Sequence, residues 1–313
     1  MSEDKFLIFS GSSNKKLAES IAEKLGKKLG KSGIGTFSDG EIRFQSHENV
    51  RGADVFVVQS LTSDINFHIM ELLLMADAFK RASAKRITAV IPYYAYARQD
   101  RKDRPRVPIS ARLLADLLET AGFSRVLTID LHANQIQGFF NIPVDNLMGL
   151  PIFASHFKKM DSENIVIVSP DAGGVERARN FSKLLKAGLA IADKRRTAPN
   201  VAEIFHIIGD VDGKDAIIVD DIVDTAGTLS ATIKAVRNNG AKRVFALCTH
   251  GIFSGEAIKR IAQSPVDSVY TTDTVPLING KEDCEKIKVL SVAELFATAI
   301  ESIHNETSVS KLF

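Results

Sequence analysis

Short apolar runs rich in β-branched residues recur along the chain and alternate with longer segments in which apolar residues follow a helical period. Apolar strands separated by helices are typical of a parallel sheet that helices cover on both faces. The pattern therefore predicts an α/β protein. Examples of the predicted strands are Phe6–Phe9, Asp54–Val58, Ile87–Ile91, Val126–Ile129, Ile165–Val168, Ala216–Val219 and Val244–Leu247.

Three segments of the first half resemble segments of the second half, in the same order and at an offset near 160 residues. This agreement favours two copies of one fold over a single large sheet with coincidental strand similarity. We therefore expect two domains, 1–147 and 148–313. The matched pairs are Val50–Val58 with Val211–Val219, Ala84–Val90 with Ala241–Leu247, and Leu7–Ser10 with Val166–Ser169.

The composition is that of an ordinary globular protein, with 313 residues, 45% of them hydrophobic and 25% charged. The formal net charge of +2 gives no general electrostatic reason to bind nucleic acid or a membrane, so anion recognition must be local. Cys248 and Cys284 lack the spacing of a zinc or redox site and are expected to be buried thiols. Without a secretory signal or a membrane-spanning run, the cytoplasm is the expected location.

The clearest chemical motif is Ala216–Leu229, where a buried strand leads into a short turn that opens a helix. Backbone N–H groups at a helix N-terminus can hold a phosphate, and Thr225 and Thr228 would add hydroxyl donors. Gly227 would let the backbone approach a ligand closely. This half of the motif predicts a phosphate site.

Asp220 and Asp221 stand just before that turn, and carboxylates do not favour a phosphate. They would instead accept hydrogen bonds from sugar hydroxyls or bind Mg²⁺ through water. A phosphorylated sugar satisfies both halves of the motif. The alternative is that Asp224 or Thr225 merely caps the helix and that the paired acids are solvated.

Val219–Thr228 resembles the phosphoribosyl pyrophosphate loop of the type I phosphoribosyltransferase fold, and nearly the whole chain is similar to the bacterial ribose-phosphate pyrophosphokinase family. The resemblance implies two tandem copies of that fold. It also implies an enzyme that makes phosphoribosyl pyrophosphate and AMP from MgATP and ribose 5-phosphate, for nucleotide biosynthesis. The residues it assigns to ribose 5-phosphate are Arg196, Asp220, Asp221, Asp224, Thr225, Ala226, Gly227 and Thr228.

Two segments of the first half are assigned to ATP by this resemblance. Thr36–Glu41 is a turn by composition, and Phe37 would stack on the adenine. In Tyr96–Asp100, an arginine followed by an amide suits a polyphosphate and a purine edge. The basic run Arg98–Arg106 also permits a nucleic-acid patch, which the near-neutral chain disfavours. The predicted ATP-binding residues are Phe37, Asp39, Gly40, Glu41, Arg98 and Gln99.

His132 and Asp171 each follow a predicted strand, and the resemblance assigns both to Mg²⁺. A two-residue strand period would place Asp130 and His132 on the same side of their strand. Gly173 and Gly174 form a turn that could bind pyrophosphate through backbone N–H groups. A plain strand-to-helix turn is the alternative for this segment.

Asp193–Asn200 is polar and contains a proline, which predicts a mobile basic loop. In the family this is the catalytic loop, and Lys194 and Arg196 match its functional residues. The transferred diphosphoryl group gathers negative charge that fixed cations and Mg²⁺ neutralise. A solvated loop without a catalytic role is the alternative.

The resemblance further implies a homohexamer regulated by phosphate and ADP. Pro105 stands where family members usually carry serine, which would remove a hydroxyl and an N–H donor from the regulatory site. The residues that match this regulatory site are Arg51, Ser83, Arg104, Arg106, Ser308 and Ser310.

Two other functions compete with this one. A phosphoribosyltransferase that consumes phosphoribosyl pyrophosphate would have one copy of the fold, and the doubled chain argues against it. A non-catalytic regulatory homologue would tend to lose the catalytic loop or the loop glycines. Here Lys194, Arg196, Gly173, Gly174 and Gly227 are all present.

Overall fold

The protein is represented by a computed structural model that describes residues 5–158, 160, 162–195 and 204–312. Within these residues, no helix is both long and apolar enough to cross a membrane. Cys248 and Cys284 are buried free thiols, as the sequence predicts.

The chain folds into two compact units, each with a parallel sheet of its own. It passes between the units more than once, because each unit is assembled from separate stretches of the sequence. The first unit contains Met1–Met148, Thr274–Pro276 and Ser291–Phe313, and the second contains Gly149–Asp273 and Leu277–Leu290.

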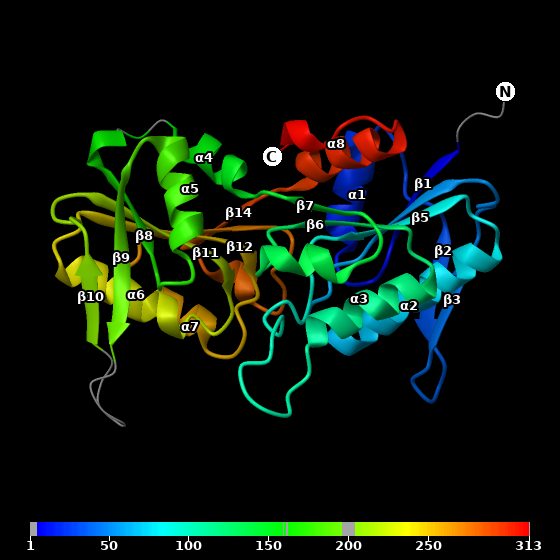
Figure 1. Cartoon of the computed structure of the whole chain (residues 1–313), viewed down its shortest axis with the longest axis horizontal. Helices are drawn as coiled ribbons and strands as arrows, with labels where there is room; N and C mark the ends of the chain where they lie inside the picture. Colours follow the sequence, from blue (N-terminus) through cyan, green and yellow to red (C-terminus); the bar gives the residue numbers. More distant parts are fainter. Residues whose placement is uncertain (1–4, 159, 161, 196–203, 313) are drawn as a thin grey trace. The chain divides into compact units, whose positions relative to one another are not determined.

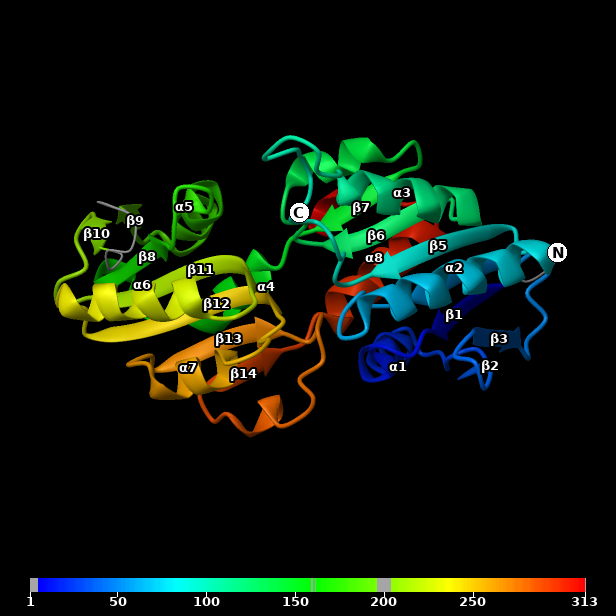
Figure 2. The same cartoon turned by 90° about the horizontal axis from the view of Figure 1, so that it is seen from below.

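The sheet of the first unit consists, in spatial order, of β1 (Phe6–Ser10), β4 (Asp54–Val58), β5 (Arg86–Ile91), β6 (Arg125–Ile129) and β7 (Val144–Leu147). The helices of this unit are α1 (Lys15–Lys24), α2 (Ile65–Arg81), α3 (Ser110–Ala121) and α8 (Ala293–His304). Within the unit, α1 and α8 cover one face of the sheet, and α2 and α3 cover the other (Figure 1, Figure 2). Because both faces are covered, the central strands are buried almost throughout, which explains their continuous apolar sequences.

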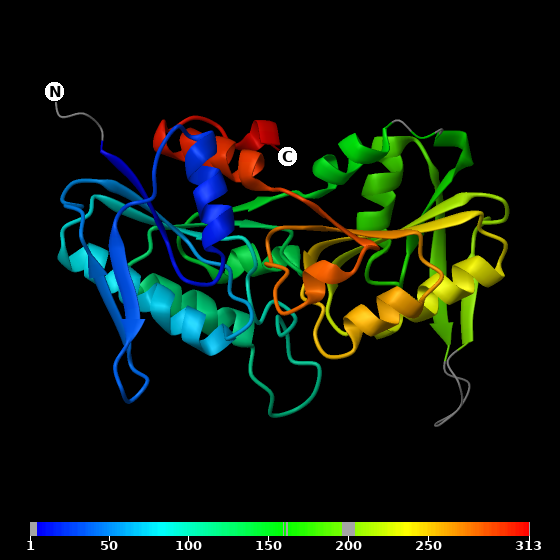
Figure 3. The ribbon, with the colours of Figure 1, turned by 180° about the vertical axis from the view of Figure 1, so that it is seen from behind.

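The sheet of the second unit consists, in spatial order, of β10 (Ile204–Ile208), β9 (Gly188–Arg195), β8 (Ile165–Ser169), β11 (Asp215–Val223), β12 (Arg243–Gly251), β13 (Ser268–Thr272) and β14 (Ile287–Leu290). Only β10 is antiparallel to its neighbour. Separate apolar clusters fill the two faces of this sheet. Helices α4 (Leu150–Phe157) and α5 (Val175–Leu185) cover one face, and α6 (Gly227–Asn238) and α7 (Ala257–Gln263) cover the other (Figure 3).

The smaller elements lie outside the two main sheets. An antiparallel hairpin of β2 (Ser32–Thr36) and β3 (Ile42–Ser46) belongs to the first unit. The sequence predicted the turn of this hairpin but not its strands, which are only half-buried and carry little apolar periodicity. The short 3₁₀ helices are η1 (Asn134–Phe139), η2 (Ser162–Asn164), η3 (Lys281–Asp283) and η4 (Ser310–Leu312).

Two equivalent ion pairs mark the two units as copies of one fold. The strand order β1-β4-β5-β6-β7 corresponds to the order β8-β11-β12-β13-β14. Asp54 opens β4 and pairs with Arg86 at the start of β5, and Asp215 opens β11 and pairs with Arg243 at the start of β12. The hydrogen bond from Arg243 holds the pKa of Asp215 below its usual range. The predicted duplication is therefore confirmed by the strand order and by these equivalent ion pairs.

The compact units differ from the predicted domains at the C-terminal end. We expected all of 148–313 in the second domain, whereas Ser291–Phe313 packs with the first unit. The physical cause is the apolar face of α8, where Phe296 and Ile300 are fully buried and which contacts α1. Thr274 also belongs to the first unit, where its carbonyl accepts a hydrogen bond from Ser60 Oγ at 2.6 Å.

Candidate active site

Much of the predicted chemistry lies at one edge of the second sheet. Strands β9, β8 and β11 are parallel neighbours, so their carboxyl ends lie at the same edge. Asp171 follows β8, Lys194 lies near the end of β9, and residues 224–228 follow β11. Ligands of open α/β sheets bind outside this edge. The topology thus gathers the predicted sugar-phosphate loop, one predicted metal ligand and the predicted catalytic lysine.

Asp220 and Asp221 lie inside β11, which continues to Val223, whereas the sequence predicted that the strand stops before them. Pairing with β12 extends the strand, with Asp220 opposite Cys248. The Asp221 side chain is 3% exposed and that of Asp220 is 29% exposed. Burial and the neighbouring Asp221 raise the pKa of Asp220 above its ordinary value.

Arg177 on α5 is a cation that faces this acid pair, and it is not among the residues predicted from the sequence. Its Nη1 atom lies 3.0 Å from Asp221 Oδ1 and 3.6 Å from Asp220 Oδ1. The positive charge of Arg177 acts to lower the pKa of Asp220, against the effect of burial. Arg177 lies in the first turn of α5, directly after the predicted pyrophosphate turn. This position in the sequence could have indicated a role in the site.

The loop between β11 and α6 presents polar groups to solvent. Ala226 adopts a left-handed backbone with φ of 56°, which the sequence did not predict. Gly227 is the first residue of α6, and a Cβ there would meet only Thr225 Oγ1 at 3.8 Å and Arg260 Nη1 at 3.9 Å. Thr225, Gly227 and Thr228 are exposed, so their hydroxyl and N–H groups are accessible to a ligand.

Two neighbours brace this loop. Ser254 Oγ donates to Asp224 Oδ1, and the Ser254 N–H donates to the Asp224 carbonyl at 3.0 Å. Arg260 on α7 donates from Nη1 to the Thr225 carbonyl at 2.7 Å. Arg260 therefore places a positive charge beside the predicted phosphate loop. Because Arg260 follows the loop by more than thirty residues, the sequence motif does not indicate it.

The β8–α5 turn has the form that the sequence predicts, with α5 beginning at Val175. Asp171 is exposed, and its Oδ1 atom accepts the Gly174 N–H at 2.9 Å. A Cβ on Gly174 would lie 2.9 Å from Ser169 Oγ, and one on Gly173 would lie 3.3 Å from Asp171 Oδ1. Both glycines are therefore explained by close packing within the turn itself.

The predicted catalytic loop begins later than we expected. Asp193–Arg195 lies in β9, where Lys194 is opposite Phe205 of the antiparallel strand β10. This pairing supplies hydrogen-bond partners that a free loop would lack, so the strand extends into the polar segment. Arg196 and the rest of the predicted loop lie outside the described residues.

In the first unit, Phe37 lies at the turn of the β2–β3 hairpin. Its N–H donates to the Glu41 carbonyl at 2.7 Å, and the Glu41 N–H donates to Asp39 Oδ1 at 3.1 Å. Gly40 has φ of 96°, a backbone that requires glycine. The Phe37 side chain is 51% exposed, with the Arg43 guanidinium 5.8 Å from its ring centre. An aromatic ring presented in this way is suited to stacking on a base.

Arg98 and Gln99 follow β5 in an exposed turn. Gln99 Oε1 accepts a hydrogen bond from Ser110 Oγ at the start of α3, and its backbone carbonyl accepts the Ala111 N–H at 3.2 Å. Tyr96 has φ of 61°, and its hydroxyl donates to Asn66 Oδ1 at 2.7 Å. The turn that carries these two of the predicted ATP ligands is thus held in place by α2 and α3.

His132 lies beyond the end of β6, at the same edge of the first sheet as Arg98 because β5 and β6 are parallel neighbours. The expectation that Asp130 and His132 share one side of a strand is wrong. Strand β6 ends at Ile129, and Asp130 has φ of 45°, so strand alternation does not apply there. His132 itself is exposed.

The predicted regulatory residues lie in three parts of the first unit. Arg51 and Ser83 belong to two turns that contact each other. The N–H of Gly52, which follows Arg51, donates to the Ser83 carbonyl at 2.8 Å. Ser308 Oγ donates to Ser310 Oγ at 3.0 Å in the C-terminal segment. Their proposed partners Arg104 and Arg106 lie in the exposed segment before α3, where Arg106 has φ of 65°.

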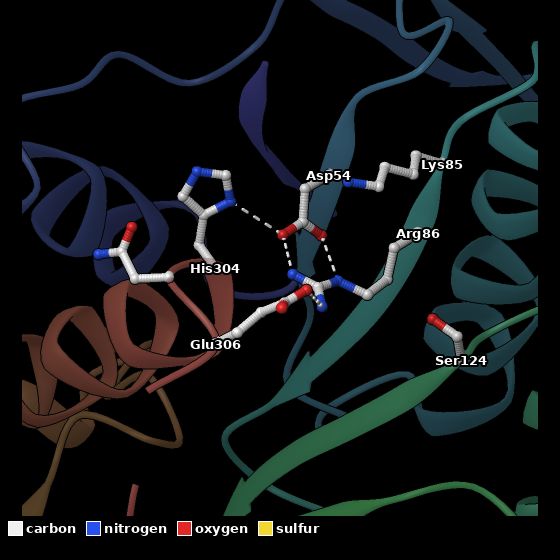
Figure 4. Close-up of a pocket in the computed structure, with 7 residues that line it drawn as sticks. Asp54, Lys85, Arg86, Ser124, His304 and Glu306 are labelled. Carbon is white, nitrogen blue, oxygen red and sulfur yellow. Dashed lines mark hydrogen bonds and ion pairs between the residues drawn. The ribbon is translucent and has the colours of Figure 1, made fainter. Parts of the chain in front are cut away.

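A cavity of about 640 Å³ lies at the edge of the first sheet where β4 and β5 begin (Figure 4). At its centre, Asp54 accepts hydrogen bonds from both Arg86 and His304 Nδ1, the latter at 3.0 Å. Arg86 also donates to the Ile303 carbonyl at 3.2 Å, which ties the end of α8 to the sheet. The cavity is lined by Asp54, Lys85, Arg86, Ser124, His304, Asn305 and Glu306, none of them a predicted substrate ligand.

Comparison with known proteins agrees with the sequence resemblance. Residues 6–122 match a family model described as the N-terminal domain of ribose phosphate pyrophosphokinase. Residues 193–313 match a model described as a phosphoribosyl synthetase-associated domain.

Curated relatives and a solved structure extend this likeness over nearly the whole chain. A ribose-phosphate pyrophosphokinase from Caldanaerobacter subterraneus is 59% identical over 98% of this chain and 97% of the relative. One from Halalkalibacterium halodurans is 55% identical over 98% of this chain and 96% of the relative. The crystal structure of phosphoribosylpyrophosphate synthetase from Mycobacterium smegmatis has a TM-score of 0.92 at 40% identity, covering 96% of this chain and 99% of that one.

Proposed function

The chain belongs to the ribose-phosphate pyrophosphokinase family, and we propose that it transfers the β,γ-diphosphoryl group of ATP to ribose 5-phosphate. The products are 5-phosphoribosyl 1-pyrophosphate and AMP. The observation that carries this function is identity of 59% to a ribose-phosphate pyrophosphokinase over 98% of the chain. The carboxylate pair beside an exposed phosphate-type loop suits the sugar phosphate.

Ribose 5-phosphate binds at the carboxyl end of β11. The exposed residues Thr225, Gly227 and Thr228 offer N–H and hydroxyl groups to the 5-phosphate at the start of α6, where the helix dipole is positive. Asp220 and Asp221 accept hydrogen bonds from the ring hydroxyls. Arg260, which already holds the Thr225 carbonyl, adds positive charge beside the phosphate.

ATP binds through the first copy of the fold. The exposed ring of Phe37 stacks on the adenine, and the polar hairpin residues around it contact the base edge. The guanidinium of Arg98 engages phosphate oxygens, and Gln99 the purine edge. This division explains why the second copy alone carries the sugar-phosphate loop.

Mg²⁺ fits the donors that this chain offers. His132 and Asp171 are both exposed, and the single hydrogen bond from Gly174 leaves the second carboxylate oxygen of Asp171 accessible. Within the described residues, no group of three or more His, Cys, Asp or Glu side chains could hold a metal ion. Mg²⁺ needs no such cage, because it is commonly held by one or two carboxylates, here that of Asp171, together with substrate phosphates and water. When bound, it would neutralise charge on the ATP phosphates.

The chemical step is an in-line displacement at the β-phosphorus of ATP. The anomeric oxygen of ribose 5-phosphate forms a bond to that phosphorus, and the bond to the oxygen that bridges the α- and β-phosphorus breaks. AMP leaves with the bridging oxygen, and the hydroxyl proton passes to solvent. Lys194 and Arg196 neutralise the charge that develops on the transferred group, so positioning and electrostatics supply most of the catalysis.

A homohexamer in the cytoplasm, with phosphate and ADP as effectors, completes the proposal. Its support is the match of Arg51, Ser83, Ser308 and Ser310 to the family's regulatory positions. The turns of Arg51 and Ser83 lie against each other, as a shared site requires.

The function is tested by incubating the purified protein with MgATP, with and without ribose 5-phosphate. We expect AMP and 5-phosphoribosyl 1-pyrophosphate to form in equal amounts, and only when the sugar phosphate is present. A phosphoribosyltransferase would instead leave ATP intact and consume 5-phosphoribosyl 1-pyrophosphate in the presence of a base. Intact ATP in both incubations would refute the proposal.

A further inference from the structure

Asp220, Asp221 and Arg177 form one charge cluster in the second unit. The backbone N–H of Asp221 donates to Asp220 Oδ1 at 2.9 Å, which turns the Asp220 carboxylate toward Asp221. Arg177 Nη1 lies 3.0 Å from one of them and 3.6 Å from the other. The Arg177 side chain is only 22% exposed, so its guanidinium is held within the site.

Two adjacent, partly buried carboxylates repel each other when both are ionised. Arg177 offsets part of this repulsion, so without it one of them would take up a proton more readily or turn away from the other. Either change removes an acceptor, because a protonated carboxyl donates a hydrogen bond through its O–H. Vicinal ribose hydroxyls are donors that need acceptors at fixed positions, so the binding site depends on both carboxylates.

We propose that Arg177 is a positioning residue for ribose 5-phosphate: it holds the Asp220 and Asp221 carboxylates in the orientation that accepts hydrogen bonds from the ribose hydroxyls. The inference rests on the proposed function and names a residue outside the predicted site. Arg177 lies in the first turn of α5, directly after the turn that contains Asp171. The first turn of α5 therefore contacts the acid pair through Arg177 and follows directly on the turn that contains Asp171.

The test compares Arg177→Gln, Arg177→Lys and the wild-type protein by steady-state kinetics with each substrate varied in turn. We expect Arg177→Gln to raise the KM for ribose 5-phosphate about tenfold or more, with the KM for ATP within about twofold. Arg177→Lys keeps the positive charge but lacks the planar guanidinium that can contact two carboxylates. Its KM for ribose 5-phosphate should therefore lie between those of the wild-type protein and Arg177→Gln. Arg179→Gln is the matched control, because Arg179 is exposed on the same helix.

A double-mutant cycle separates action through the acid pair from direct contact with substrate. If Arg177 acts through the pair, adding Arg177→Gln to Asp220→Asn changes the KM for ribose 5-phosphate by less than about threefold. The neutral side-chain amide that Asp220→Asn introduces would not repel Asp221. Removing Arg177 should therefore destabilise the fold less in the Asp220→Asn variant than in the wild-type protein. An undiminished effect in the Asp220→Asn background would overturn the proposal.

The outcomes distinguish this inference from the proposed function. Wild-type protein that forms no AMP refutes the function. Wild-type protein that forms AMP, together with an Arg177→Gln variant whose KM for ribose 5-phosphate is normal, refutes the inference alone. Equal increases in both KM values, without recovery in Arg177→Lys, would also overturn it.

Discussion

Replacing Lys194 with alanine is expected to lower turnover by about 10³-fold while the KM for ATP stays within about twofold. The transferred diphosphoryl group carries most of its charge on nonbridging oxygens, and fixed cations stabilise that charge most strongly in the transition state. Lys194 lies near the carboxyl end of β9, at the edge of the sheet where the sugar-phosphate loop also lies. Its removal therefore affects the chemical step more than binding.

Single-turnover measurements of AMP formation test this prediction directly, because they separate the chemical step from product release. Lys194→Arg should retain more activity than Lys194→Ala, since it keeps a cation on the same strand. Lys183→Ala is the control for loss of a surface lysine, because Lys183 is exposed on α5. Near-normal single-turnover rates for Lys194→Ala would show that the catalytic assignment is wrong.

Replacing Asp54 with alanine is expected to lower the free energy of unfolding of the first unit by about 3–5 kcal/mol. The Asp54 side chain is 4% exposed, and its loss leaves the partly buried guanidinium of Arg86 without its carboxylate. His304 loses its hydrogen-bond acceptor at the same time, which weakens the attachment of the end of α8 to the sheet. The expected local consequence is faster amide exchange in α8.

The duplicated fold provides a matched control for Asp54→Ala. Asp215→Ala removes the equivalent carboxylate in the second unit, where the Arg243 side chain is 49% exposed and stays solvated. We therefore expect a smaller loss of about 1–2 kcal/mol. Hydrogen exchange followed by mass spectrometry reports each unit separately. Unchanged protection of α8 in Asp54→Ala, or an equal loss in the two variants, would contradict the prediction.

The sequence predicted the fold correctly where the pattern of apolar residues determines the structure. The buried strands β4 and β11 are almost continuously apolar, and their likeness at a constant offset predicted the duplication. The hairpin of β2 and β3 was missed because half-buried strands lack that pattern. The place of Ser291–Phe313 was also missed, since the partners of α8 lie at the other end of the chain.

The sequence predicted only those parts of the candidate site whose residues are neighbours in the chain. The acid pair and residues 224–228 stand in one motif, and the structure keeps them together. Arg177 and Arg260 reach that motif from other helices, so only the packing of α5 and α7 reveals them. The left-handed backbone of Ala226 was not predicted, because alanine gives no sequence signal for that conformation.

In the proposed reaction, the bond between the β-phosphorus and the oxygen bridging it to the α-phosphorus is broken. ATP labelled with ¹⁸O at that bridging position tests it, with phosphorus NMR used to locate the label after reaction with ribose 5-phosphate. The predicted result is AMP that carries all of the label and an unlabelled diphosphoryl group on the sugar. Formation of ADP, or label in the sugar product, would contradict the account.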